Sequence, residues 1–426
     1  MKKRNVTALL ITLSLAMSGL GAMTGYAEES GEKTVLRQMV WGSIDDYVPD
    51  NEIFMELSPE YADSVELSVE LGGSGDADVA QRFRLMLASG EELPDMIRLN
   101  YTQFAEFADA GVLYDMGEVL APYEDDIIDA AKELMTYDGT YYATIFEIKP
   151  KVWFYRSDIF EECGINVDEV KTIDDFIAAA ETIHETYPDS YLENYGTPLN
   201  NYDLTMMLCA TGGTFCDEEG NYHCASDEGV RQAFENLKKL KDSGAFSDIV
   251  EWSADWQAAF SDDTLISQLL GGWMKDHLIN WTPENAGKWA VAPWPEEIAQ
   301  GSESGGGIWV VPKDAPNAEL AAEILAKYSY DSEIRKAIYD RNGRIPPLKS
   351  AAEDEHYLNS DYFGDMSGYF EALEKFSVYP YNPASSQELT IVGDYLTQYL
   401  DGAMSLDEAL SAADADLNNQ IGNPYQ

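Results

Sequence analysis

GTYYATIFEIKPKVWFYRSDIF occupies residues 139–160 and is the most informative stretch of this chain. It opens on the turn residue Gly139 and then alternates apolar and aromatic residues with polar ones, which is the pattern of a β-strand. Proline has no N–H to donate to a strand ladder, so we expect Pro150 to mark a break between two extended segments. The carboxylate of Glu147 beside this break is typical of a chain that crosses between two lobes above a polar cleft.

Short apolar runs alternate with helical periodicity upstream of this stretch. The expected elements are strands at 36–40 and 64–71, a third strand that starts at 93 and ends at Asn100 and Tyr101, a helix at 51–61, and a helix capped by Thr102. Strands that alternate with helices indicate an α/β fold with a mainly parallel sheet. In such a fold, loops at the carboxyl ends of the strands form the ligand crevice.

The same alternation continues downstream. Thr172 precedes a segment with helical spacing of its apolar residues. The glycine run 305–307 leads into a predicted strand at 308–311, and Asn317 is placed to cap the helix after it. Ser405 and Glu408 have the spacing of a capping box for the last helix.

The N-terminus has the features of an export signal. Lys2, Lys3 and Arg4 precede the apolar residues 6–23, and Ala27 is suited to cleavage, so we assign residues 1–27 to a signal peptide. An uncleaved membrane anchor is the alternative, although the apolar run is short for a membrane span. The remaining 399 residues exceed one typical core and predict two lobes.

Charge narrows the range of partners. All 77 acidic residues and 24 of the 27 basic ones follow residue 27, which gives that part a formal charge of −53. Such a surface repels nucleic acid and anionic membranes, so we expect neither as a partner. The same negative charge could attract a positively charged ligand, so a cationic ligand remains an alternative.

The four cysteines are too few for a disulfide scaffold. Cys216 and Cys224 flank a predicted hairpin turn around Gly220, so a disulfide between them fits, and free thiols fit equally well. The cluster of Cys209, Cys216, His223 and Cys224 matches no standard zinc-finger spacing, so we expect no metal.

Five further segments carry a resemblance to a known family. They are ELPDMIRLNYTQFAEFADAGVLYDM (92–116), TGGTFCDEEGNYHCASDEGV (211–230), LLGGWMKDHLINW (269–281), GGGIWVVPKDAPNAELAAEIL (305–325) and NGRIPPLKS (342–350). Together with 139–160, and in this order, they resemble the extracellular solute-binding proteins (family 1) of carbohydrate ABC transporters, especially the maltose and maltodextrin type.

The resemblance implies a two-lobed periplasmic-binding-protein fold of type II, with a mixed, mainly parallel sheet in each lobe. The N-terminal lobe would comprise 28–148 and 308–345, and the C-terminal lobe 149–307 and 346–426. Three crossings would then form the hinge, and closure around a ligand is a standard domain motion.

A sugar presents apolar C–H faces and a ring of hydroxyls, so its site needs flat aromatic rings together with carboxylates, amides and arginine. The resemblance places Trp273, in GGWM, where the family has a tryptophan that stacks on the sugar. The full set of implied ligand-binding residues is Trp41, Asp45, Asn100, Tyr101, Glu147, Tyr202, Trp273, Trp309, Arg344 and Tyr381.

Structural roles remain open for three of these residues. Trp309 fits hinge packing, Arg344 fits an ion pair, and Tyr381 fits a loop cover. Three other aromatic residues are interpreted as core or groove-edge positions and are left out of the site: Trp153, Tyr155 and Trp256.

The resemblance predicts a monomeric, exported binding protein that captures a di- or oligosaccharide and delivers it intact to a membrane permease, without a cofactor. No lipobox cysteine precedes Cys163, so lipid anchoring through an N-terminal cysteine is not expected. Two alternatives stay open. One is a binding protein for a cationic or peptide ligand such as a polyamine, held by carboxylates between aromatic rings. The other is an exported glycosidase, for which acidic pairs are abundant but no G-x-S-x-G motif appears.

Overall fold

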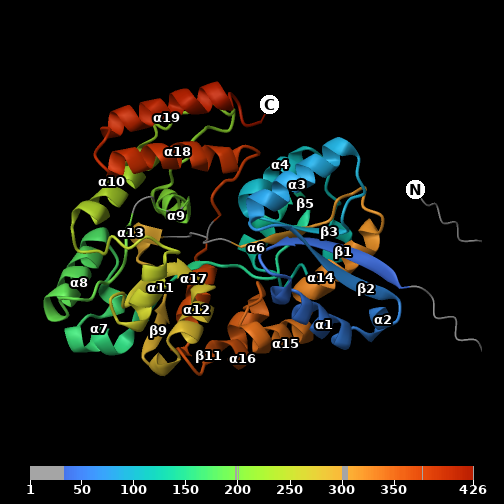
Figure 1. The fold of residues 1–426 in the computed structure, drawn as a ribbon, viewed down its shortest axis with the longest axis horizontal. Helices are drawn as coiled ribbons and strands as arrows, with labels where there is room; N and C mark the ends of the chain where they lie inside the picture. Colours follow the sequence, from blue (N-terminus) through green and yellow to red (C-terminus); the bar gives the residue numbers. More distant parts are fainter. Residues whose placement is uncertain (1–32, 197–198, 200, 300–305, 377, 426) are drawn as a thin grey trace, which may run out of the picture.

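Two α/β bodies lie side by side in the protein, each built around its own β-sheet (Figure 1). The computed structural model describes residues 33–196, 199, 201–299, 306–376 and 378–425, and the side chains of Asn201 and Tyr202 are also outside the description. The expected signal peptide at 1–27 lies outside the described residues. The two-lobed α/β fold predicted from the sequence is confirmed.

The first lobe contains a mixed five-stranded sheet in the order β2-β1-β3-β10-β6. Its strands are β1 (Thr34–Trp41), β2 (Val65–Gly73), β3 (Met96–Leu99), β6 (Ala143–Thr144) and β10 (Ile308–Val310). β1 is parallel to β2 and β3, whereas β10 is antiparallel to both of its neighbours. Because Ile308 pairs with Leu99, the chain enters β10 at the carboxyl end of β3.

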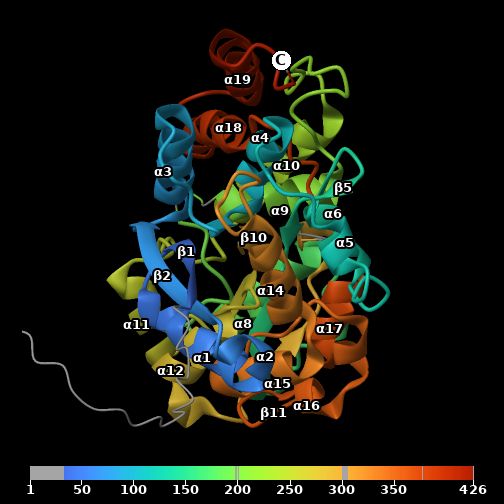
Figure 2. The same cartoon turned by 90° about the vertical axis from the view of Figure 1, so that its right-hand side faces the viewer.

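Helices pack on this sheet, with α3 against β1, β2 and β3 and α14 against β6 (Figure 2). The helices are α1 (Val48–Leu57), α2 (Pro59–Ala62), α3 (Asp76–Ser89), α4 (Tyr101–Asp109), α5 (Gly117–Leu120), α6 (Asp129–Leu134), α14 (Ala318–Tyr330) and α15 (Ser332–Asn342), with η1 (Ile44–Asp46) and the hairpin β4 (Thr136–Tyr137) and β5 (Thr140–Tyr141) beside them.

The second lobe differs from the expected mainly parallel sheet. Its sheet has the order β8-β7-β9, and β7 (Lys151–Arg156) is antiparallel to both β8 (Ser267–Gly271) and β9 (Trp289–Ala292). The reason is directional: β7 runs away from the crossing, whereas β8 and β9 both return towards it. The carboxyl end of β8 therefore still faces the first lobe.

Helices α18 and α19, at the end of the chain, pack with α9 and α10 in the second lobe, although α14 and α15 before them belong to the first (Figure 1). The helices of the second lobe are α7 (Ser157–Cys163), α8 (Ile173–Thr186), α9 (Asn201–Thr211), α10 (Glu228–Asp242), α11 (Ala254–Ser261), α12 (Met274–Trp281), α13 (Glu296–Ala299), α17 (Ser367–Glu374), α18 (Ser385–Leu400) and α19 (Leu406–Gln420). Shorter elements are η2 (Val167–Glu169), η3 (Pro283–Asn285), η4 (Lys349–Glu353), α16 (Glu355–Leu358), β11 (Asn359–Ser360) and β12 (Gly364–Asp365).

Local signals explain most boundaries. The expected break at Pro150 is confirmed, because β6 ends at Thr144 in one sheet and β7 begins after the proline in the other. The capping box of Ser405 and Glu408 is confirmed at the start of α19. One cap was predicted wrongly: Asn100, two residues earlier than Thr102, caps α4, because its side-chain oxygen accepts the Thr102 N–H at 3.2 Å.

Candidate functional site

The first crossing carries a buried carboxylate held between cations. Glu147 is 3 % exposed, and its Oε2 lies 3.4 Å from Lys149 Nζ and 3.9 Å from an Arg344 nitrogen. Burial on its own would raise the pKa of Glu147, but the neighbouring positive charges, Lys149 and Arg344 foremost, outweigh it and lower the pKa. Glu147 is therefore an anion with hydrogen-bond acceptors at the point where the chain changes lobe.

Three guanidinium groups surround the ring of Phe146, the residue before Glu147. The central carbons of Arg98, Arg335 and Arg344 lie 5.2, 5.7 and 5.7 Å from the ring centroid, within cation–π range. These residues come from β3, α15 and the segment after α15, so this ring joins three elements of the first lobe.

Trp41, at the end of β1, is half-buried, and the Arg98 guanidinium carbon lies 4.4 Å from its ring centroid. The second crossing passes directly over this pair. A Cβ added at Gly307 would lie 2.8 Å from Trp41 Cη2 and even closer to Arg98, so only glycine allows this approach. Trp41, Arg98 and Gly307 therefore form one packed unit.

Arg344 makes the ion pair that the sequence left open as its alternative role. Its Nη1 lies 2.7 Å from Oδ2 of the fully buried Asp50, whose other oxygen is 2.7 Å from Arg341. Next to it, a Cβ added at Gly343 would lie 2.7 Å from Lys275 Nζ of the second lobe. The segment after α15 therefore connects the carboxylate network of the first lobe to α12.

A group of aromatic side chains lies in the second lobe, at the end of a strand that faces the first lobe. Trp273 follows the end of β8, occupies the N-cap position of α12 and is half-buried. Trp252 stacks on it with centroids 5.1 Å apart and planes at 25°, and His277 meets it edge-on at 5.5 Å. Such rings offer the flat apolar surface that the faces of a sugar require.

Trp252 was missed by the sequence reasoning. It is 61 % exposed and has a φ of +66°, in the left-handed region that a bulky residue rarely adopts. Its place in an exposed loop before α11 was the only available signal, because no spacing rule predicts stacking between residues so far apart in the chain.

Tyr101 and Tyr381 lie on the wall of a second cavity, between the lobes. The cavity has a volume of about 170 Å³. Its lining residues are Tyr101, Phe104, Ala105, Glu133, Leu134, Thr136 and Tyr137 from the first lobe and Val378, Tyr379, Pro380 and Tyr381 from the segment before α18. Tyr101 is buried, and a Cβ at Gly306 would lie 2.6 Å from its hydroxyl.

The other predicted ligand-binding residues are either buried, engaged in structural contacts, or in a different lobe from the aromatic pair. Asp45 is exposed in η1, and the Asn100 side chain is engaged as a helix cap. Trp309 is 2 % exposed in β10 and packs edge-on against Tyr47 at 6.1 Å, as its alternative hinge role implied. A ligand role for each of the ten residues remains a prediction.

Sequence comparison identifies the family. Residues 59–361 match the profile of the bacterial extracellular solute-binding proteins. The chain belongs to this family. An arabinooligosaccharide-binding protein of Bacillus subtilis is 24 % identical over 395 residues, covering 88 % of each chain.

Solved structures of other binding proteins share the fold of the chain. The sugar-binding protein MalE from Xanthomonas citri superposes with a TM-score of 0.78 at 17 % identity, covering 91 % of this chain and 97 % of its own. The ABC-transporter-associated binding protein from B. animalis subsp. lactis, in complex with β-1,6-galactobiose, has a TM-score of 0.72 at 23 % identity, covering 91 % and 97 %. These relatives are binding proteins.

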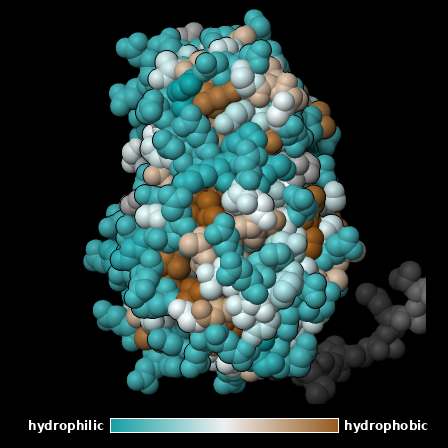
Figure 3. Space-filling model, turned by 90° about the vertical axis from the view of Figure 1, so that its left-hand side faces the viewer, coloured by the Kyte–Doolittle hydropathy of each residue, from teal (hydrophilic) through white to brown (hydrophobic). Residues whose placement is uncertain are grey.

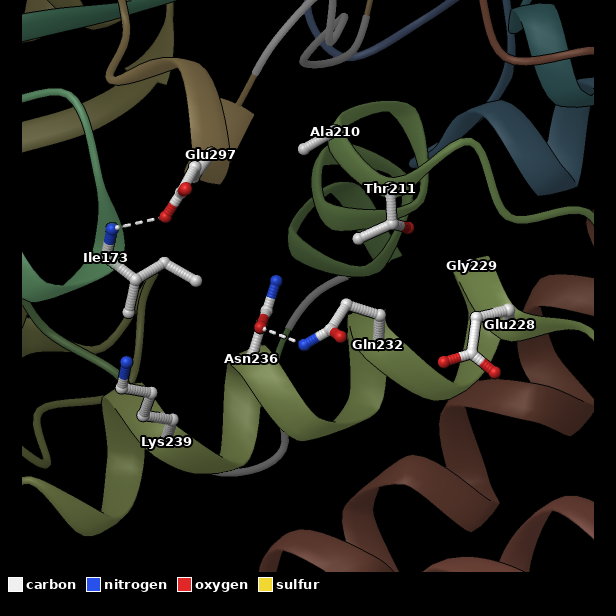
Figure 4. Close-up of a pocket in the computed structure, with 9 residues that line it drawn as sticks. All are labelled: Ile173, Ala210, Thr211, Glu228, Gly229, Gln232, Asn236, Lys239 and Glu297. Atoms are coloured by element: carbon white, nitrogen blue, oxygen red, sulfur yellow. Dashed lines mark hydrogen bonds between the residues drawn. The ribbon is translucent and has the colours of Figure 1, made fainter.

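A larger cavity, of about 550 Å³, lies on the second lobe and involves none of the ten predicted residues. Figure 4 shows it between the end of α9, one side of α10 and Glu297 of α13, which accepts a hydrogen bond from the Ile173 N–H at 3.1 Å. The described residues that line it include no aromatic ring. The outer face of this lobe is mostly hydrophilic (Figure 3), in keeping with the acidic composition.

The cysteines are free thiols in this structure, so the disulfide between Cys216 and Cys224 is not formed. Burial raises the pKa of Cys216 to about 11.

Among the described residues, no group of three or more metal-ligating side chains occurs. Within the same ranges, no helix has both the length and the apolar composition needed to cross a bilayer.

Proposed function

We propose that this protein captures a di- or oligosaccharide between its lobes and delivers it to the permease of an ABC importer. The observation that carries the proposal is the aromatic pair of Trp273 and Trp252, at the end of a second-lobe strand that faces the first lobe. The relatives whose names specify oligosaccharides support it.

The lobes would divide as the sequence predicted, into 28–148 with 308–345 and 149–307 with 346–426. Strand pairing supports this division, because β10 joins the first sheet and β7 to β9 form the second. Ligand binding would close the hinge at the three crossings, and the closed form would be the one that the permease recognises. We further propose an exported monomer that acts without cofactor or chemical step.

The rival ligand class, a cation, is disfavoured by the ion pairs at the crossing. Both buried carboxylates there already have cationic partners: Asp50 has Arg341 and Arg344, and Glu147 has Lys149. A polyamine site needs carboxylates that are free to receive the ligand. The glycosidase alternative requires a carboxyl pair that can exchange protons, whereas the pKa of Glu147 is lowered.

A thermal-shift screen over sugars, polyamines and peptides tests the proposal. We expect a shift with sugars, with the sugar recovered unchanged. Trp273→Ala should abolish the shift and leave the unliganded melting temperature nearly unchanged. Tyr187→Ala, an aromatic truncation after α8 where the hydroxyl donates to Glu162 at the surface, is the control and should retain the shift. Release of a hydrolysis product, or a full shift with Trp273→Ala, contradicts the proposal.

A further inference from the structure

Positive charge is concentrated at the crossing of a strongly acidic chain. The sequence has 27 basic and 77 acidic residues. Around Phe146 and Glu147 this ratio is reversed by a group of side chains that we call the basic cluster. Its members are Arg98, Lys149, Lys275, Arg335, Arg341 and Arg344.

Three carboxylates face these six cations. Asp50 is paired with two arginines, Glu147 lies 3.4 Å from Lys149, and Asp276 lies 2.8 Å from Lys275. The nearby Asp45 and Asp46 are exposed to solvent, where water and salt screen their charge. The basic cluster therefore keeps a formal excess of positive charge in a largely buried place.

Hydrogen-bond donors in the cluster also lack acceptors. Arg335 is fully buried, and none of its three guanidinium nitrogens has a hydrogen-bond partner among the described residues. Arg98 is 7 % exposed, and its Nε likewise has none within the described ranges. A buried charged donor without an acceptor carries a desolvation penalty that a bound anion would offset.

Two members of the cluster lie beside the predicted ligand surfaces, one buried and one partly exposed. Arg98 lies over the ring of Trp41, one of the predicted aromatic surfaces. Lys149, on the crossing itself, has a side chain that is 17 % exposed, and its ion pair with Glu147 is long. Arg98 and Arg344 repel its charge and, after burial, contribute to lowering its pKa.

We propose that the ligand is a carbohydrate that bears a carboxylate, as in a uronic acid, and that Lys149 receives this carboxylate while the buried Arg98 adds positive charge behind it. This inference rests on the proposed function, because the aromatic pair of Trp252 and Trp273 would hold the sugar faces. The ammonium of Lys149 is a compact positive charge with several N–H donors, which a carboxylate can accept. One bound carboxylate would reduce the formal excess of the cluster from three positive charges to two.

Isothermal titration calorimetry with matched disaccharides tests this. The panel holds galacturonate, glucuronate and mannuronate disaccharides, the methyl ester of each, and the corresponding neutral disaccharides. We expect at least one acid to bind about tenfold or more tightly than its methyl ester, with an affinity that falls as NaCl is raised.

Lys149→Met keeps the length of the side chain and removes its charge. It should weaken binding of the acid about tenfold more than binding of the methyl ester. Lys375→Met is the matched control, because Lys375 makes an exposed pair with Glu371 on α17. The unliganded melting temperature of each variant shows whether it is folded.

The outcomes separate this inference from the proposed function. Neutral sugars that bind as tightly as every acid overturn the inference and leave carbohydrate binding intact. Equal weakening of acid and ester by Lys149→Met overturns the role of Lys149. If no sugar in the panel binds, and the wider thermal-shift screen also finds none, both proposals fail.

Discussion

Trp252 stacks on Trp273 with ring centroids 5.1 Å apart and ring planes inclined by 25°. This contact is held by a left-handed backbone at Trp252, which costs about 1–2 kcal/mol for a residue with a Cβ. Because Trp252 is 61 % exposed, burial offsets little of that cost. Strain that persists at an exposed aromatic residue is typical of a functional site.

Trp252→Gly should therefore separate stability from binding. Glycine adopts a positive φ without strain, so the free energy of unfolding should change by less than about 1 kcal/mol, with relief of strain offsetting lost ring contacts. The affinity for the sugar should fall by about tenfold or more, because one aromatic surface is lost. Thermal melts and calorimetry measure the two quantities, and unchanged affinity would exclude Trp252 from the site.

Glu147→Gln should destabilise the protein by about 3–5 kcal/mol at pH 7, because it leaves Lys149 and Arg344 without their buried carboxylate. The folded-state pKa of Glu147 lies below its ordinary value of 4.5, so its stabilising contribution is present above that pH and is lost as the pH falls through the folded-state pKa. The difference in unfolding free energy between wild type and variant should shrink accordingly in acid.

Urea denaturation of both proteins from pH 7 down to about pH 3 measures this difference. Glu371→Gln is the control, because its pair with Lys375 is exposed and should contribute less than about 1 kcal/mol. A difference that grows as the pH falls would contradict the charged state assigned to Glu147.

Gly307→Ala should weaken both the fold and the site. The added Cβ would lie 2.8 Å from Trp41 Cη2 and against Arg98, and such overpacking costs about 1–3 kcal/mol. Displacement of Trp41 and Arg98 should also lower ligand affinity. Gly75→Ala is the control, because a Cβ there meets nothing within 4 Å. Identical melting temperatures and affinities for the two variants would show that the close approach at Gly307 is unimportant.

Features with a strong local cause were predictable from the sequence. The break at Pro150 follows from the missing N–H of proline, and the start of α19 follows from the side chains of Ser405 and Glu408. Both signals act within a few residues, so tertiary contacts did not override them. The position of Trp273 beside the end of β8 was predicted in a different way, from the resemblance of its motif to the family.

Long-range relationships were not predictable in this way. The direction of β8 and β9 relative to β7 depends on how long connections return to the sheet, which residue patterns do not encode. The burial of Arg335 against Phe146 joins residues far apart in the chain. Arginine is usually found at the protein surface, so its sequence position gave no reason to expect burial. Asn100 and Thr102 were both acceptable caps, and only the backbone conformation distinguished them.

The interleaved order of the strands has a consequence for synthesis. β6 is hydrogen-bonded to β10, and β10 also pairs with β3, so the first sheet stays incomplete until residue 310 has been made. The last two helices are needed to cover α9 and α10. A nascent chain, growing from its N-terminus, therefore carries open strand edges for most of its translation, and neither half acquires its native packing early.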